Sequence, residues 1–196
     1  MKTILFRSFL LLVLLGVLPV SCCRQATRDY VYLKEMTLEL ADAAGSPLSS
    51  GARTSAAELR ATLRFRIDYV AQGTAGSPFI GTAQALQCPA EGMNGFKSDV
   101  TEVVLTSTGL FNGRAVGQSL NSFVRCSTAN SPTEFPLSQL ADSLNTKKGQ
   151  EYRINLPIVL RISPRPTDNA QQQFHVRVRV AGSQELTQTT PDITWN

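Results

Sequence analysis

His175 is the only histidine in this chain of 196 residues, so it limits the acid–base and metal chemistry that the protein can perform. A serine-nucleophile triad would need it as the base, and a multi-histidine metal site would need more than one. Residues 117–121 read GQSLN, which begins like a nucleophile elbow but lacks the closing glycine. The sequence also has no CxxC pair, HExxH motif or EF-hand loop. We therefore expect neither a metal site nor a cofactor.

Paired carboxylates would be another route to catalysis, as in glycosidases. The candidates include Glu102, Glu134 and Asp142, and nothing in their spacing selects two of them. The stretch GTAGS at residues 73–77 lacks the Gly-Lys-Ser/Thr ending of a phosphate-binding loop and is followed by Pro78. We expect no catalytic residues, and we predict that the protein is not an enzyme.

Two adjacent cysteines, Cys22 and Cys23, follow an apolar stretch at residues 9–20 that contains no charged residue. Two basic residues precede this stretch, which is shorter than the roughly 20 apolar residues that span a bilayer, so the pattern predicts a cleaved export signal. A cysteine after a small residue resembles the acylation site of bacterial lipoproteins. Ser21 makes Cys22 the expected lipidated residue, with Cys23 as the second choice. The alternative is an ordinary secretory signal with two incidental cysteines.

Cleavage of the signal at residues 1–21 removes Lys2 and Arg7 and lowers the formal net charge from +4 to +2. So small a charge predicts no nucleic-acid binding, which needs a clustered, strongly basic face. Residues 22–29 are expected to form a polar tether, and residues 30–196 have the ordinary size of one domain. The expected partner of the tether is a membrane, which two or three acyl chains would hold firmly.

Two further cysteines, Cys88 and Cys126, lie near the ends of predicted strands. Export permits a disulfide between them. In the chain-entropy model it would stabilise the fold by about 4 kcal/mol, provided that the Cα atoms lie within about 7 Å. The alternatives are two reduced, buried cysteines, or a bridge from Cys23 to one of them.

Alternation of apolar and polar residues is the strongest structural signal. It runs through residues 59–69 (LRATLRFRIDY), 152–162 (YRINLPIVLRI) and 174–180 (FHVRVRV), and it predicts strands with one apolar face. Pro157 predicts that its strand lies at an edge or carries a bulge. Further strands are expected at residues 30–40, 79–87, 100–106, 119–125 and 185–195.

One helix is expected at residues 136–144, PLSQLADSL, where leucines recur at helical spacing and a proline occupies the first turn. Because each strand offers only one apolar face, a second sheet must cover the first. We predict an all-β, two-sheet antiparallel sandwich of immunoglobulin-like type with one short connecting helix. The run QQQ at residues 171–173 is too short to predict anything.

Arginines alternate on the polar faces of two predicted strands. The two rows consist of Arg60, Arg64, Arg66, Arg177 and Arg179. If the two strands are neighbours in one sheet, the rows merge into a basic face that can bind an anionic glycan, lipopolysaccharide or phospholipid headgroups. The alternative is that the arginine stems cover the sheet and keep their charges in water.

Residues 98–123 and 174–195, together with the double cysteine, resemble the uncharacterised lipoproteins of Bacteroidota that carry a single domain of unknown function. The resemblance implies a membrane-anchored sandwich and supplies no functional residues. Surface-exposed members often carry an acidic tag after the cysteine, whereas residues 23–28 read CRQATR. We therefore expect an anchor in the outer membrane, facing the periplasm. The predicted role is a non-catalytic binding or scaffolding module for a glycan or envelope protein, and the alternative is a structural subunit of a pilus-like surface assembly.

Overall fold

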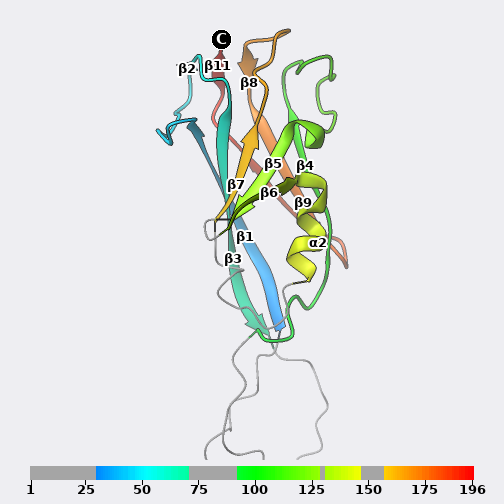
Figure 1. Cartoon of the computed structure of the whole chain (residues 1–196). Coiled ribbons are helices and arrows are strands. Elements are labelled where there is room, and N and C mark those ends of the chain that lie inside the picture. The colour runs from blue at the N-terminus through cyan, green and yellow to red at the C-terminus, as the bar shows by residue number, and fades with distance from the viewer. Residues whose placement is uncertain (1–29, 71–91, 129–130, 147–156) are drawn as a thin grey trace, which may run out of the picture.

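The computed structural model describes residues 30–70, 92–128, 131–146 and 157–196 (Figure 1). Its larger sheet has five antiparallel strands in the order β1-β3-β7-β5-β6. They are β1 (Tyr30–Asp42), β3 (Leu59–Val70), β7 (Ile158–Ile162), β5 (Val124–Thr128) and β6 (Ser131–Pro136). Every second residue of β3 from Leu59 to Phe65 is buried, as the alternation predicts.

A second sheet of three antiparallel strands faces the first. It has the order β10-β9-β4, with β4 (Val100–Ser107), β9 (Phe174–Val180) and β10 (Gln184–Thr189). The central strand β9 has the predicted bounds and alternates strictly between buried and more exposed residues. Both sheets contribute to one hydrophobic core cluster, with Leu63 and Leu160 from the larger sheet and Leu105 and Val178 from the smaller. The predicted all-β antiparallel sandwich of immunoglobulin-like type is confirmed.

A small third sheet, which the sequence did not predict, lies at one end of the sandwich (Figure 1). Its middle strand is β11 (Ile193–Trp195), which pairs parallel to β2 (Ala52–Thr54) and antiparallel to β8 (Gln171–Gln172). Trp195 is fully buried, and its ring lies against those of Phe111 and Phe174. This sheet therefore closes the end of the core with an aromatic cluster.

The predicted helix is present in two parts, a 3₁₀ turn η3 (Leu137–Gln139) and α2 (Leu140–Asn145). Leu137, Leu140 and Leu144 are buried, and Pro136 precedes the first turn. Asn145, at the end of α2, accepts a hydrogen bond from the backbone N–H of Val100 and donates one to its carbonyl, both at 2.8 Å. The side-chain amide of Asn145 thus pairs with the open edge of β4 as a neighbouring strand would.

Asn121 makes the same kind of contact further along β4. Its Nδ2 donates to the carbonyl of Val103 at 2.8 Å, and its Oδ1 accepts from the N–H of Leu105 at 3.0 Å. Asn121 begins a 3₁₀ turn, η2 (Asn121–Phe123), and β5 starts only at Val124. The strand predicted at residues 119–125 is therefore wrong in its first half, because Asn121 pairs with β4 through its side chain.

Three other predicted strands differ from the structure or lie wholly or partly outside the described residues. The strand at 185–195 is two strands, since β10 ends at Thr189, β11 begins at Ile193 and Pro191 lies between them. The strand at 152–162 is described only from residue 157, and β7 begins at Ile158 in the interior of the sheet, so the edge position predicted from Pro157 is wrong. Because Pro157 precedes the strand, the ladder loses no donor. The strand at 79–87 lies outside the described residues.

The two ends of the sandwich differ in what they carry. The antiparallel pairing places Tyr30 opposite Val70 at one end, and Asp42 opposite Leu59 at the other. The third sheet lies at the second end, where the indole N–H of Trp195 bonds the carbonyl of Ala56, shortly before β3 (Figure 1). The 13 residues of β1 span about 40 Å between these ends.

Candidate functional site

The predicted cysteine sites fall largely outside the described residues. Cys22, Cys23 and Cys88 all lie there, so the lipidation site and the disulfide stay predictions. Cys126 lies on β5, has no exposed surface and forms no disulfide with a described residue. Burial raises the pKa of Cys126 to about 12, which keeps the thiol protonated at neutral pH.

The two predicted arginine rows do not form one face. Arg60, Arg64 and Arg66 are on β3 in the five-stranded sheet, whereas Arg177 and Arg179 are on β9 in the facing sheet. Since each row lies on the outer side of its own sheet, the rows point away from one another across the core. The two strands are therefore not neighbours in one sheet, and the predicted merged basic face is wrong.

Each arginine of the two rows also contacts a carboxylate, which lies on a neighbouring strand or, for Arg60, at Glu58 just before β3. Arg66 and Arg64 lie 3.3 and 4.0 Å from glutamates of β1, and Arg179 lies 3.1 Å from both Glu102 of β4 and Glu185 of β10. Glu102 also contacts Arg177, at 3.6 Å. Their charges are therefore partly neutralised by partners that only the strand pairing brings close.

A denser ion-pair cluster lies on the outer face of the larger sheet and includes two arginines that the sequence rows missed. The register places Arg161 of β7 between Arg60 of β3 and Arg125 of β5. Arg161 bonds Glu58 from one side and Glu134 from the other. The hydrogen bond and positive charge of Arg161 lower the pKa of Glu58, and Arg60 adds to the effect. This cluster is an internally paired network and offers no unpaired carboxylate dyad.

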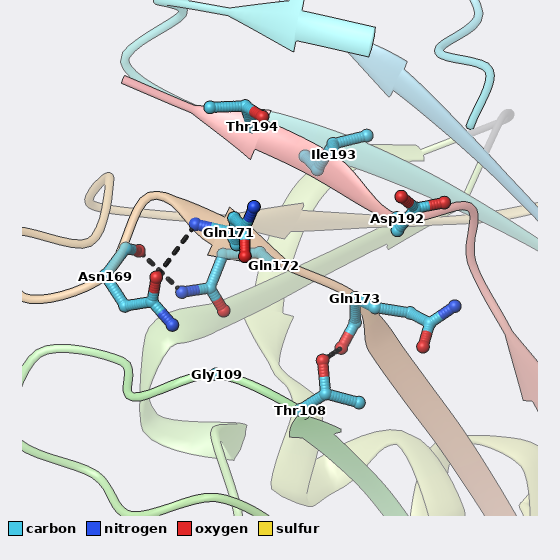
Figure 2. A pocket seen from close by; sticks show the side chains of 9 residues that line it. All are labelled: Thr108, Gly109, Asn169, Gln171, Gln172, Gln173, Asp192, Ile193 and Thr194. Atoms are coloured by element: carbon cyan, nitrogen blue, oxygen red, sulfur yellow. Dashed lines mark hydrogen bonds between the residues drawn. The ribbon is translucent and has the colours of Figure 1, made fainter. Parts of the chain in front are cut away.

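The candidate site is a polar hollow of about 260 Å³ beside the third sheet, which we call the amide hollow (Figure 2). It lies between the end of β4, the β8 segment and β11. Its lining consists of Thr108, Gly109, Asn169, Gln171, Gln172, Gln173, Asp192, Ile193 and Thr194. Four of these nine residues carry side-chain amides, and Asp192 is the only ionisable one.

The floor of the amide hollow is fixed by buried hydrogen bonds. Gln172 is only 2% exposed, and its Nε2 donates to the carbonyls of Leu110 and Asn169 at 2.8 and 2.7 Å. Its Oε1 accepts from the hydroxyl of Ser107 at 2.5 Å, and that hydroxyl in turn accepts the N–H of Gly109. All the hydrogen-bonding groups of the Gln172 amide are therefore used within the protein, which makes Gln172 a structural support.

Gly109 allows the loop after β4 to approach the β8 segment closely. A Cβ atom added at Gly109 would lie 2.5 Å from the carbonyl oxygen of Gln171 and 2.7 Å from Nδ2 of Asn169. Such contacts are too short for any side chain, so this position requires glycine on steric grounds.

The walls of the hollow retain unused hydrogen-bonding groups. Asn169 accepts the N–H of Gln171 through Oδ1 at 2.9 Å, while its Nδ2 has no partner among the described residues. The same holds for the side-chain amide of Gln171 and for Oε1 of Gln173, whose Nε2 donates to a carbonyl. Across the hollow, Asp192 accepts from the hydroxyl of Ser50 through Oδ1 and keeps Oδ2 open. These open donors and acceptors are distributed around the hollow, with Asn169 at the left of the view in Figure 2 and Asp192 and Gln173 at the right.

Sequence reasoning missed this site. The QQQ run at 171–173 predicted nothing, yet it supplies the buried support and two wall residues. One signal was available in the sequence. The three amides directly precede the strand at 174–180, and continuing its alternation backwards predicts that Gln172 is buried.

Among the described residues there is no cluster of three His, Cys, Asp or Glu side chains that could hold a metal ion. Within the same part of the chain, no helix has the length and apolar character needed to cross a membrane.

The histidine and the three carboxylates named above do not meet in space. His175 lies on the outer side of β9, with Nδ1 2.7 Å from the hydroxyl of Thr189. Glu102 is on the smaller sheet, Glu134 is on the larger sheet, and Asp142 is on α2.

Comparison with protein-family models, with curated proteins and with solved structures gives no match to this chain.

Proposed function

We propose that this protein is a membrane-anchored lipoprotein of the cell envelope and a non-catalytic binding or scaffolding module, with the amide hollow as its binding site for a glycan or envelope protein. One observation carries the proposal: the hollow lies at the end of the sandwich opposite the start of β1 (Figure 1). A lipid on Cys22, joined by a tether at 22–29, would hold the start of β1 near the membrane. The hollow would then face outward, about 40 Å further away.

The chemistry of the hollow supports a binding role without catalysis. Its single ionisable residue, Asp192, has no second carboxylate, histidine or thiol among the lining residues with which to share a proton. The glutamates that might have acted as an acid pair, Glu102 and Glu134, are each held by arginines. Side-chain amides around an open space, above a floor fixed by Gln172, are suited to holding a polar ligand without transforming it.

Palmitate labelling tests the anchor. The protein is expressed in a Gram-negative host of the Bacteroidota, as the full chain and as Cys22→Ala and Cys23→Ala, and the cells are then fractionated. Label and membrane association lost only in Cys22→Ala is the expected result, and protease resistance in intact cells would support the periplasmic side. Absence of label from all three forms would overturn the lipoprotein reading.

Site-specific photo-cross-linking tests the binding site. A photoreactive residue is placed at Gln171 in the wall of the hollow, and at Gln188 on β10 as a matched exposed glutamine outside it. We expect envelope adducts from position 171 and none from 188. Equal yields from both positions, or none from either, would contradict a binding role for the hollow.

A second candidate is the structural subunit of a pilus-like assembly, which rests on the position of β1. This strand is at the edge of the larger sheet, follows the predicted tether and supplies buried Val31, Leu33, Met36 and Leu40 to the core. An edge strand of this kind can in principle be exchanged between copies. Envelope extracts analysed by electrophoresis with and without boiling test it, since strand-exchanged polymers would give a heat-sensitive ladder and a binding module would run as one band.

A further inference from the structure

We infer that the amide hollow recognises a neutral, hydroxyl-rich glycan residue, in preference to an anionic sugar or a protein side chain. This inference rests on the proposed binding function and narrows its ligand. It follows from the charge of the lining, from the pattern of its open donors and acceptors, and from the rigidity of its floor.

The charge of the lining argues against an anionic ligand. Of the described residues, no lysine or arginine lines the hollow, and Asp192 places a negative charge at its wall. Phosphate, sulfate and uronate groups are bound in proteins mainly by arginine, lysine or helix N-termini. An anion entering this space would meet a carboxylate without a compensating cation, so a neutral ligand is favoured.

The lining argues equally against an apolar or protein ligand. The only large apolar residue in it, Ile193, is 3% exposed and turned into the core. Protein hot spots depend on aromatic and arginine anchors that fill dry pockets, and this hollow lacks such groups on its own side. Its volume of about 260 Å³ is also below the roughly 300–1,000 Å³ of ordinary small-molecule sites, which fits one residue of a larger ligand.

The open groups of the walls match what a sugar presents. Asn169 Nδ2 is a donor, Asp192 Oδ2 and Gln173 Oε1 are acceptors, and the Gln171 amide is both. A hydroxyl also donates and accepts, so adjacent hydroxyls on a ring can pair with an amide on one side and a carboxylate on the other. Gln172 and Gly109 hold the floor that supports Asn169, so little ordering of Asn169 should be needed on binding.

The affinity should be modest, because the lining has no aromatic ring on which a sugar could stack. We expect a Kd of about 1 mM for a short oligosaccharide. The full-length chain, purified in detergent micelles and labelled with ¹⁵N, is titrated with glucan, mannan, galactan and N-acetylglucosamine oligosaccharides. Polygalacturonate and heparin oligosaccharides serve as anionic probes. The readout is the side-chain NH₂ resonances of Asn169 and Gln171.

At least one neutral probe should shift both resonances saturably. Gln171→Ala and Asp192→Ala should each raise its Kd about 5- to 10-fold, since each removes hydrogen bonds to the ligand, and in Gln171→Ala the Kd is read from the Asn169 resonance. Gln188→Ala on β10 is the matched control and should leave Kd unchanged. Trp195 is the only tryptophan, so an unchanged emission spectrum verifies that each variant keeps its fold at this end. If Asp192→Ala alters that spectrum, Gln171→Ala, which changes an exposed side chain, carries the test.

The outcomes separate this inference from the proposed function. Tighter binding of an anionic probe at the same resonances would overturn the neutral-glycan inference and keep the binding role. No saturable shift with any neutral probe, while Gln171 still gives protein cross-links in cells, would overturn it in favour of a protein partner. No shift with any probe and no cross-link from position 171 would overturn both.

Discussion

Trp195 connects the C-terminal strand to the core, and its removal should cost the protein much of its stability. The indole is fully buried, its centroid lies 6.1 and 6.4 Å from those of Phe111 and Phe174, and Nε1 donates to the carbonyl of Ala56 at 2.6 Å. Trp195→Ala removes up to about 250 Å² of buried surface and leaves a cavity. Such changes lower the free energy of unfolding by about 3–5 kcal/mol, out of a total of about 5–15 kcal/mol for a domain.

Urea unfolding followed by far-UV circular dichroism measures this loss. With an m value of about 2 kcal/mol/M, the midpoint should fall by about 2 M. Trp195→Phe keeps a ring in the cluster and loses the bond to Ala56, so it should cost less, about 1–2 kcal/mol. Thr194→Ala, on the other face of β11, should stay within about 0.5 kcal/mol of the parent. A midpoint change below about 0.5 M in Trp195→Ala, with m unchanged, would refute the view that β11 belongs to the cooperative core.

Three further predictions concern other parts of the sandwich. Asn121→Ala should lower the free energy of unfolding by about 2 kcal/mol, because it leaves two backbone groups of β4 unpaired. Faster hydrogen exchange at the Leu105 amide would locate the effect, and unchanged exchange there would contradict it. The lowered pKa of Glu58 makes its pair with Arg161 stabilising above pH 4.5 and progressively lost below it, as the carboxylate protonates. Since the pair is partly solvated, the loss should be under about 1 kcal/mol. Arg161→Met should therefore make the urea unfolding midpoint depend less on pH between pH 6 and pH 3. With its pKa near 12, reduced Cys126 should have about a thousandfold less thiolate than an ordinary cysteine and resist alkylation until urea unfolds the chain, as peptide mass spectrometry can measure. Rapid native alkylation at Cys126 would disprove its burial.

The strands that could be predicted from sequence are those whose two faces meet different surroundings. Residues 59–69 and 174–180 alternate because one face packs on the core and the other meets water, and the structure has them with nearly those bounds. The strands β2 and β8 have too few residues to show a period, and β6 begins and ends near prolines, at Pro132 and Pro136, which argue against a strand. The pairing and order of the strands could not be predicted from the sequence, since they depend on contacts between residues far apart in the chain.

The candidate site was hidden for a different reason. Asn169, Gln171 and Asp192 are ordinary loop and edge residues when considered singly. They form a common site only because β11 pairs with β8 and brings Asp192 opposite the amides. Gly109 likewise gives no local sign of its role, because the atoms that exclude a Cβ come from residues about 60 positions away, at Asn169 and Gln171. A site assembled across a sheet edge leaves no spacing motif.

Strand pairing in the two larger sheets also determines the surroundings of the arginines. Along the chain they form rows of positive charge, but across the sheets Arg64 and Arg66 meet glutamates of β1, and Arg179 meets Glu102 and Glu185. An outer face whose charges are already paired can attract an anion only by breaking those pairs. The open amide and carboxylate groups of the amide hollow differ from these arginines, because they have no partner among the described residues. A ligand can bind them without breaking an existing interaction. A polar ligand would therefore gain more hydrogen bonding at the end of the sandwich than on its charged faces, which is why we propose the amide hollow as the recognition site.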